Sequence, residues 1–455
     1  MVLCKLSGLP KCLLSATIFI PMTSRRERIK RLRNFLSWMV QQWKLALLLA
    51  MLLNLAAEGP PPGSLDTQVN RLLAGEGFDF AGWEVEAVVG KLTHSLLGPQ
   101  RYMDESARRD FFIDYLGLVA DIQQLDWGIR FTYTDPQIQD PEAATVELRA
   151  RLVELRAAQR ARQAFAESIL EEQTASILID EGFGVLGQEV PPTSLHFTPL
   201  PMLLVVSPRD HIEKVLDLYL RHGLDVAQQE VIEEQVDTMQ DVSSLVTGIG
   251  GLSAYPAMLL ESSSLNWVAE VAAHEWTHHY LTPRPLGWNY DASPGTRTIN
   301  ETVASIVGKE VGRRVVARYY PELLPLEPEP VPEASEPDAA LPEPPAFDFR
   351  TEMRKTRIRV DELLGEGKIE AAEAYMEERR QEFVAQGYYI RKLNQAYFAF
   401  HGAYADEPGA AGLDPVGPAV QELRALSSDL HTFVARVAHV TSWAELQAQL
   451  AKIQE

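Results

Sequence analysis

Residues 262 to 285 have a pattern that fits an amphipathic helix and few other structures. Ser262, Ser263 and Ser264 offer N-cap hydroxyls at its start, and Pro283 and Pro285 end it. Between these signals, apolar residues recur at spacings of three and four: Leu265, Val268, Ala269, Ala272 and Trp276. The pattern predicts a helix with one buried stripe.

Two histidines lie on this predicted helix, in the pentapeptide His-Glu-Trp-Thr-His. His274 and His278 are four residues apart, so their imidazoles share one face and could bind one metal ion. Glu275 lies about 100° around the helix from His274, where it could reach a water held by the metal without binding the metal itself. The alternative is a polar helix face with two solvated histidines, and the pentapeptide alone does not exclude it.

A catalytic zinc ion takes three protein ligands, so a third ligand is expected downstream. The metzincin pattern requires Gly at position 281 and His at position 284, and the chain has Leu281 and Arg284 instead. Glu301 follows His278 after 22 intervening residues, at the start of another apolar-periodic segment. Glu301 is therefore the predicted third ligand, with Glu310 as the rival and a solvated first-turn glutamate as the alternative.

The spacing around Glu301 supports this assignment. One predicted helix face carries the carboxylate followed only by small residues, which are Ser305, Gly308 and Gly312. The opposite face carries residues suited to a core, which are Val303, Ile306 and Val307. Small residues let two helices approach closely, so Glu301 is expected to point at the neighbouring helix. Glu310 does not share this face.

His274-Glu275-x-x-His278 followed by Asn300-Glu301-x-x-Ala304 resembles the gluzincin metallopeptidases, the group of thermolysin and the aminopeptidase-N type enzymes. The resemblance covers about 60 residues, from 255 to 312. It implies one Zn²⁺ per chain, held by His274, His278 and Glu301, with Glu275 as the general base. The chain departs from the pattern in a longer His-to-Glu spacing and in Ser305, which stands where thermolysin-like enzymes have an aspartate.

The resemblance also implies an edge strand before the zinc helix, which would pair with the substrate backbone. Residues 257–261 occupy that place, so Leu259 and Glu261 are predicted to bind substrate. The Gly-x-Met-Glu-Asn signature that holds the substrate amine in aminopeptidase-N relatives is absent. Glu261 is the nearest candidate for that role, and a solvated strand-end glutamate is the alternative.

Enzymes of this group use a Tyr or His to stabilise the oxyanion. Residues 387–404 are rich in aromatic side chains and resemble the Leu-Asn-x-Ala and later Tyr pattern of a bacterial predicted-aminopeptidase family. Tyr404 and His401 are the preferred catalytic candidates, ahead of Tyr388 and Tyr389. The alternative for each of them is a structural role in a core helix.

The first 57 residues resemble an export signal. A basic region precedes a 13-residue apolar run at 45–57, which predicts a signal peptide or a signal anchor and an extracytoplasmic location. Met22 and Met39 are alternative starts. Cys4 and Cys12 both lie in this segment, so the exported part has neither disulfides nor thiol chemistry.

The charge of the exported part limits its partners. Residues after 57 carry 33 basic and 62 acidic side chains, a net charge of −29. Nucleic acid is therefore excluded as a partner, and a peptide substrate is expected. Membrane contact is expected only through the N-terminal apolar segment, and the oligomeric state is open.

The predicted fold is α+β and mostly helical: a gluzincin-like core with a small mixed sheet, flanked by helical N- and C-terminal parts. Short apolar runs at 129–133, 202–206 and 257–261 suggest the strands, and a long charged helix is expected over 143–180. Between Pro321 and Asp348 there are nine prolines, eight acidic residues and no basic one, which predicts disorder.

The predicted organisation follows from these segments. We expect a signal or anchor at 1–57, a linker at 58–65, a helix-rich region with short strands at 66–240, a zinc-peptidase core at 241–320, the disordered segment at 321–348 and a helical region at 349–455.

Two hypotheses from different classes follow. The first is an exported zinc metallopeptidase, with aminopeptidase activity as one option. The second is a membrane-tethered, non-catalytic helical binding or scaffold protein with a degenerate His-Glu-x-x-His motif.

Overall fold

The structure is a computed structural model that describes residues 63–98, 102–325 and 347–454. The chain divides into two units, Met1–Thr67 and Gln68–Glu455, and nearly everything described here belongs to the second. The predicted signal segment 1–57, most of the linker 58–65 and most of the segment 321–348 lie outside the described residues. No helix among the described residues is both long enough and apolar enough to span a bilayer.

Helices dominate the described residues and the strands are short, which confirms the predicted helix-rich α+β class. The helices are α2 (Leu65–Leu72), α3 (Phe80–Leu97), α4 (Glu105–Thr134), α5 (Pro141–Ala144), α6 (Val146–Leu178), α7 (Val226–Gln240), α8 (Leu265–Leu281), α9 (Pro285–Trp288), α10 (Pro294–Tyr319), α11 (Phe349–Gly365), α12 (Ile369–Ala385), α13 (Gln395–His401), α14 (Val416–Ala425), α15 (Leu430–Val437) and α16 (Trp443–Gln454). A π-helical turn, η2 (Ile179–Phe183), follows α6, and a 3₁₀ turn, η3 (Pro321–Leu323), follows α10.

Within the described ranges, eight short strands form three sheets. The strands are β1 (Gly184–Val185), β2 (Gln188–Glu189), β3 (Leu195–Phe197), β4 (Met202–Pro208), β5 (Leu216–Leu220), β6 (Val242–Gly248), β7 (Gly251–Leu252) and β8 (Ala257–Leu259). Their orders are β1-β2, β3-β8-β7 and β5-β4-β6.

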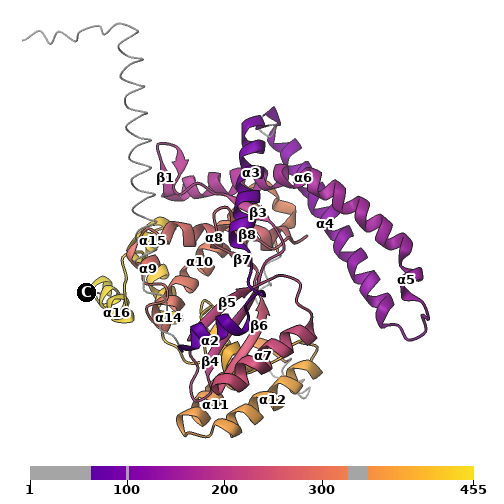
Figure 1. Ribbon diagram of the computed structural model, residues 1–455. Helices are drawn as coiled ribbons and strands as arrows, with labels where there is room; N and C mark the ends of the chain where they lie inside the picture. The colour runs from indigo at the N-terminus through magenta and orange to yellow at the C-terminus, as the bar shows by residue number, and fades with distance from the viewer. Residues whose placement is uncertain (1–62, 99–101, 326–346, 455) are drawn as a thin grey trace, which may run out of the picture. The chain divides into compact units, whose positions relative to one another are not determined.

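Helices α4 and α6 pack against each other as two long neighbouring helices (Figure 1). Helix α6 confirms the long charged helix predicted over 143–180. The strand predicted at 129–133 is wrong, because these residues continue α4. The helix runs through Gly128 and ends at Thr134. Its C-cap Asp135 precedes Pro136, and a proline disfavours helical backbone in its predecessor.

The β5-β4-β6 sheet is antiparallel and confirms the strand predicted at 202–206. Leu203 pairs with Tyr219 on one side and with Thr247 on the other. Helix α7 packs on β6, and α13 packs on β4 and β6. Leu203 and Val205, two residues apart on one face of β4, form a buried cluster with Ala396 of α13.

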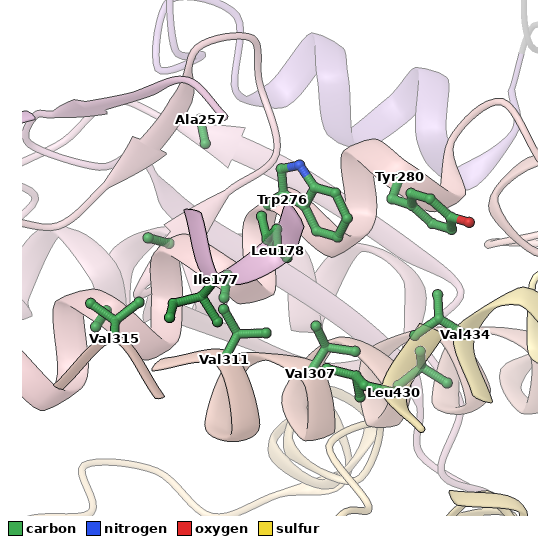
Figure 2. Close-up of a cluster of buried hydrophobic side chains, with 14 of the residues drawn as sticks. Ile177, Leu178, Ala257, Trp276, Tyr280, Val307, Val311, Val315, Leu430 and Val434 are labelled. Atoms are coloured by element: carbon green, nitrogen blue, oxygen red, sulfur yellow. The ribbon is translucent and has the colours of Figure 1, made fainter. Parts of the chain in front are cut away.

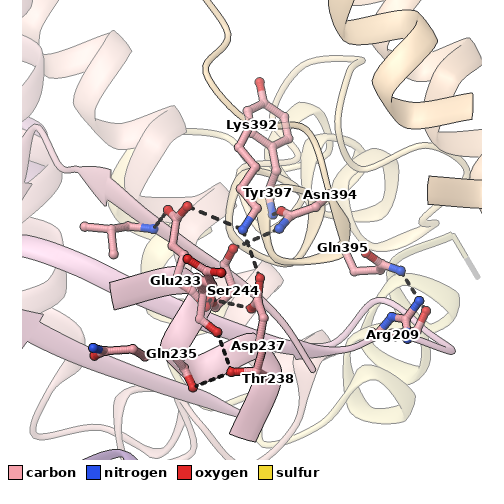
Figure 3. Close-up of polar contacts among 12 residues, drawn as sticks. Arg209, Glu233, Gln235, Asp237, Thr238, Ser244, Lys392, Asn394, Gln395 and Tyr397 are labelled. Atoms are coloured by element: carbon pink, nitrogen blue, oxygen red, sulfur yellow. Dashed lines mark hydrogen bonds and ion pairs between the residues drawn. The ribbon is translucent and has the colours of Figure 1, made fainter. Parts of the chain in front are cut away.

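Polar contacts fix α13 on this sheet (Figure 3). The Asn394 side-chain oxygen accepts a hydrogen bond from Tyr397 N at 2.9 Å and caps the helix, while its Nδ2 donates to Ser244 O at 2.9 Å. Beside it, the buried Glu233 carboxylate pairs with Arg391 and accepts from Val246 N at 2.6 Å. These bonds hold the start of the segment that leads to Tyr404.

The second three-stranded sheet is mixed, because β8 runs parallel to β3 and antiparallel to β7. The prediction that residues 257–261 form an edge strand is wrong. Strand β8 is the central strand and both of its backbone edges are paired, so it has no free edge for a substrate. The free edge beside the segment His274–His278 belongs to β7.

Helices α8 and α10 make the most extensive helix–helix contact among the described elements, and both contribute to a large buried core shared with α4, α6 and the C-terminal helices (Figure 2). Trp276 of α8 and Val307, Val311 and Val315 of α10 are buried in one cluster. Ser264 caps α8, whose predicted stripe from Leu265 to Trp276 is buried, and the helix ends at Leu281 before the two prolines. The predicted helix and its core face are confirmed.

Candidate metal centre

Helix α8 presents His274 and His278 on the side that faces α10. Their Nε2 atoms lie 3.1 Å apart. Because the helix is capped at Ser264 and buried along its stripe, its rotation is fixed and both imidazoles lie beside the core. The two ring nitrogens thus converge on one point.

Helix α10 brings Glu301 to the same point. Its Oε2 atom lies 3.5 Å from His274 Nε2 and 3.6 Å from His278 Nε2. The predicted close approach of the helices is confirmed at two glycines. A Cβ on Gly308 would lie 2.9 Å from Glu270 O, and one on Gly312 would lie 2.7 Å from Glu270 N. A larger residue at either position would push α10 away from α8.

The three side chains fit a zinc ion. In a tetrahedron with ligands at about 2.0–2.1 Å, ligand atoms lie roughly 3.4 Å apart, close to the spacings of these atoms. Glu301 is 4% exposed, and its Oε2 atom is buried without a hydrogen-bond partner among the described residues. A buried carboxylate oxygen without a partner is costly, and a cation at the shared point would remove that cost. His274, His278 and Glu301 are the one such group of potential ligands within the described ranges.

The electrostatics of this group also favour a positive charge. Burial of the His278 imidazole acts to lower its pKa, but the Glu301 carboxylate outweighs this and raises the pKa to about 9. Burial acts to raise the pKa of Glu301, but the two imidazoles hold that pKa well below its ordinary value. In the metal-free protein a proton on the imidazoles neutralises the carboxylate, and a metal ion would compete with that proton.

Two further side chains orient these potential ligands. Asn300 Oδ1 lies 2.9 Å from His278 Nδ1, which makes Nδ1–H the donor and leaves the Nε2 lone pair for a metal. The Tyr290 hydroxyl donates to Glu301 Oε1. Burial and the Glu301 carboxylate raise the pKa of Tyr290 well above 10, so its proton stays in place. Neither role was predicted, although Asn300 is next to Glu301 in the sequence.

Glu275 lies beside this group but outside it. It is 5% exposed and lines the cavity onto which the ligands open. Ser253 Oγ donates to Glu275 Oε2. A Cβ on Gly251 would lie 2.2 Å from Glu275 Oε1, so only glycine leaves room for the carboxylate there. The loop that begins at β7 therefore fixes the side chain predicted to act as the base.

The cavity has a volume of about 250 Å³. Residues from five regions line it: β4 and β5 with their connection, residues 249–253, helices α8 and α10, the connection between these two helices, and residues 399–404. The lining includes Leu203, Lys214, Asp217, Tyr219, Ile249, Gly251, Leu252, Ser253, His274, Glu275, His278, Tyr290, Arg297, Asn300, Glu301, Phe400, Ala403 and Tyr404.

Tyr404 lies where a catalytic donor was predicted. Its ring stacks on that of His274, with centroids 6.2 Å apart. Desolvation of the phenol, together with the Glu301 and Glu275 carboxylates, raises the pKa of Tyr404 well above 10. The hydroxyl therefore remains a hydrogen-bond donor at neutral pH.

Three predicted site residues do not line this cavity. His401 packs against Tyr397, with ring centroids 4.2 Å apart, and burial lowers the pKa of His401 to about 4. Leu259 is fully buried in the central strand β8. Glu261 accepts hydrogen bonds from Tyr115 and Gln159. The structure therefore does not bring His401, Leu259 or Glu261 to this cavity, because each side chain is committed to other packing or pairing.

The weaker alternatives also lie elsewhere. Tyr389 is almost fully exposed and Tyr388 packs beside Phe349. Glu310, the rival ligand, pairs with Arg424 at 2.7 Å. No protein-family model, curated protein or solved structure matches this chain.

Proposed function

We propose that this protein is a zinc-dependent metallopeptidase of the gluzincin type that hydrolyses peptide bonds. One observation carries the proposal. Three potential ligand atoms converge at zinc-like spacings, two on partly buried imidazoles and one on the buried Glu301 carboxylate. The Glu301 oxygen has no hydrogen-bond partner among the described residues, and a separate carboxylate opens onto the same cavity.

A bound zinc ion would supply Lewis-acid chemistry, polarising a water molecule and the carbonyl oxygen of the substrate. Glu275 would accept the proton of the attacking water and return it to the leaving amine. Ser253 holds one oxygen of the Glu275 carboxylate, which restrains the side chain that would carry out this transfer. Tyr404, kept protonated, would donate a hydrogen bond to the carbonyl oxygen as its negative charge develops.

The edge of the β3-β8-β7 sheet supplies a place for the substrate backbone. Gly251 and Leu252 of β7 line the cavity, and β7 pairs with only one strand. An extended peptide added to this edge would pass beside Glu275. We propose β7 for the strand-pairing role, in place of residues 257–261. The predicted export signal supports action outside the cytoplasm on peptides.

Glu275→Gln tests this function. The variant should keep its zinc and lose about 10²- to 10⁴-fold in the rate of peptide cleavage, the usual contribution of a general base. Cleavage of a mixed peptide library by the full-length protein, followed by mass spectrometry, measures this.

Glu310→Gln is the matched control, because Glu310 is a glutamate outside the cavity on α10 and pairs with Arg424. It should cleave like the wild type. If the wild type holds zinc and cleaves no peptide, the non-catalytic binding hypothesis replaces the enzyme. If Glu275→Gln cleaves at the wild-type rate, the base is misassigned.

A further inference from the structure

One end of the cavity carries two cations that the chemistry above does not use. Lys214, from the β4–β5 connection, and Arg297, from α10, both line the cavity. Their side chains are only 8% and 11% exposed. Arg297 and Glu301 are four residues apart, so the guanidinium lies on the same helix face as the potential ligand, one turn away.

The partners of these cations are more exposed than the cations themselves. Arg297 donates from Nη2 and Nε to Asp291 Oδ1, at 2.8 and 3.2 Å. Asp291 is 65% exposed and does not line the cavity. Lys214 pairs with Asp217, which lines the cavity and is 31% exposed, and its Nζ lies 3.8 Å from Asp291 Oδ1. Both cations therefore lie at the cavity wall, whereas the counter-ion Asp291 is mostly exposed to solvent.

At this end, the charged residues that line the cavity are therefore two cations, Lys214 and Arg297, and one anion, Asp217. The net charge of the whole chain is −21. An exposed partner such as Asp291 neutralises a buried cation weakly, because water screens it. Both hydrogen bonds from Arg297 go to a single oxygen of Asp291, so the planar guanidinium fork is not matched bidentately. A carboxylate that enters the cavity would therefore meet the largely buried guanidinium of Arg297, which has N–H groups that do not donate to Asp291.

We propose that this cationic end, formed by Arg297 and Lys214, binds a carboxylate of the substrate. This inference rests on the proposed peptidase function. Four residues of helix rise about 6 Å, which is roughly the span of two extended residues, so the carboxylate would lie one or two residues from the bond that is cut. Its source is the free C-terminus of a short peptide or an acidic side chain near the scissile bond.

An amine in this place is disfavoured by the same charges. Apart from Glu275 and Glu301, the acidic side chain among the described lining residues is Asp217, and the Lys214 ammonium already pairs with it. A substrate ammonium would have to displace Lys214 and would meet Arg297 beside it. The cavity therefore favours carboxylate recognition over the amine recognition of an aminopeptidase.

Binding to the metal-free, full-length protein tests the site without any catalysis. Calorimetry with N-acetyl-L-alanine and with its amide compares two probes that differ only in the carboxylate. We expect the acid to bind about tenfold more tightly or better, as for hydrogen bonds to a charged group. Arg297→Gln should lose this preference and Arg297→Lys should keep part of it. Asp291→Asn, which removes the competing counter-ion, should strengthen it.

Arg424→Gln is the control, because Arg424 pairs with Glu310 outside the cavity. It should bind the acid like the wild type. Circular dichroism checks that each variant is folded, and Asp291→Asn keeps the test informative if Arg297→Gln unfolds. Equal binding of acid and amide, or an unchanged preference in folded Arg297→Gln and Asp291→Asn, would overturn the proposal.

Hydrolysis then identifies the source of the carboxylate. Zinc-loaded wild type is offered three matched short peptides: a free acid, its C-terminal amide, and an amidated peptide with Asp in the last position. Faster cleavage of the first assigns the C-terminal carboxylate, and faster cleavage of the third assigns an acidic side chain. Faster cleavage of a free-amine peptide over its acetylated form, without preference among these three, would contradict the carboxylate site. If no peptide is cleaved, the proposed function fails while the binding measurement still decides the site.

Discussion

At the scale of single residues, two tyrosines near Glu301 have different expected roles. Tyr290 donates to the Glu301 carboxylate, whereas Tyr404 lies over His274 and opens onto the cavity. The first is placed to orient a ligand, and the second is placed to meet the substrate. Both phenols stay protonated, because burial and nearby carboxylates raise their pKa values.

Phenylalanine variants separate these roles. Tyr290→Phe should weaken zinc binding about 10- to 100-fold, the usual cost of losing a group that orients a ligand. Tyr404→Phe should keep zinc and lower kcat about 10²- to 10³-fold, as for an oxyanion donor. Chelator competition and steady-state kinetics measure the two effects. A Tyr404→Phe enzyme with wild-type kcat would remove Tyr404 from the mechanism.

The pH dependence of zinc binding follows from His278. In the metal-free protein the pKa of His278 is raised from 6.5 to about 9, so the imidazolium is the main form at pH 7. This raised pKa stabilises the metal-free fold fully below pH 6.5, and the contribution is lost as the pH rises through about 9. Zinc needs the neutral imidazole, so its apparent affinity should rise with pH up to that value.

Calorimetry in buffers with different ionisation enthalpies checks the proton balance. Zinc binding at pH 7 should release about one proton per chain. Binding without proton release would mean that His278 is already neutral and that Glu301 does not raise its pKa.

At the scale of elements, the site depends on how closely α10 approaches α8. Gly308→Ala would place a Cβ 2.9 Å from Glu270 O and 3.2 Å from His274 Cβ, both fixed parts of α8. We expect a loss of about 1–3 kcal/mol in the free energy of unfolding, the usual cost of overpacking, and weaker zinc binding. Urea denaturation and chelator competition measure these quantities.

Gly117→Ala is the matched control for this prediction. Gly117 lies within α4 and a Cβ there would meet nothing within 4 Å. Alanine should stabilise that helix slightly, by about 0.5–1 kcal/mol. If Gly308→Ala behaves like Gly117→Ala, close packing of the two helices does not hold the ligands together.

The helices of the site could be predicted because their signals are local. The serine cap, the apolar stripe and the prolines set the bounds of α8, and the small residues that follow Glu301 predicted its approach to α8. The wrong prediction of a strand at 129–133 also came from a local signal. Apolar, β-branched and aromatic residues such as Phe131 and Tyr133 also occur on an exposed helix surface, and a short run cannot distinguish the two.

Contacts across long sequence distances could not be predicted in this way. Ser253 and Gly251 meet Glu275, and Lys214 meets the α10 side of the cavity, only because the sheets and helices pack together. The order of strands in the β3-β8-β7 sheet is equally non-local, so the edge position was assigned to the wrong strand. Arg297 was not predicted either, although its spacing of four from Glu301 places it on the same helix face.

At the scale of the whole molecule, the cavity is lined by residues that are far apart in the sequence. Strands β4 and β5, helices α8 and α10, and residues 399–404 all line it. Asn394 and Glu233 hold the start of α13 against the sheet, so the Leu-Asn-x-Ala pattern has a structural explanation and Tyr404 follows from it. The segment after 349 is therefore part of the site.

Zinc stoichiometry and affinity of the full-length protein decide whether this cavity is a metal centre. Metal analysis combined with chelator competition should give about one tightly bound zinc per chain for the wild type and for Glu310→Gln. Glu301→Gln should lose most of that affinity, because it removes the charge from the one ligand supplied by α10. A wild type that binds no zinc, or a Glu301→Gln variant that binds zinc as tightly as the wild type, would contradict the assignment.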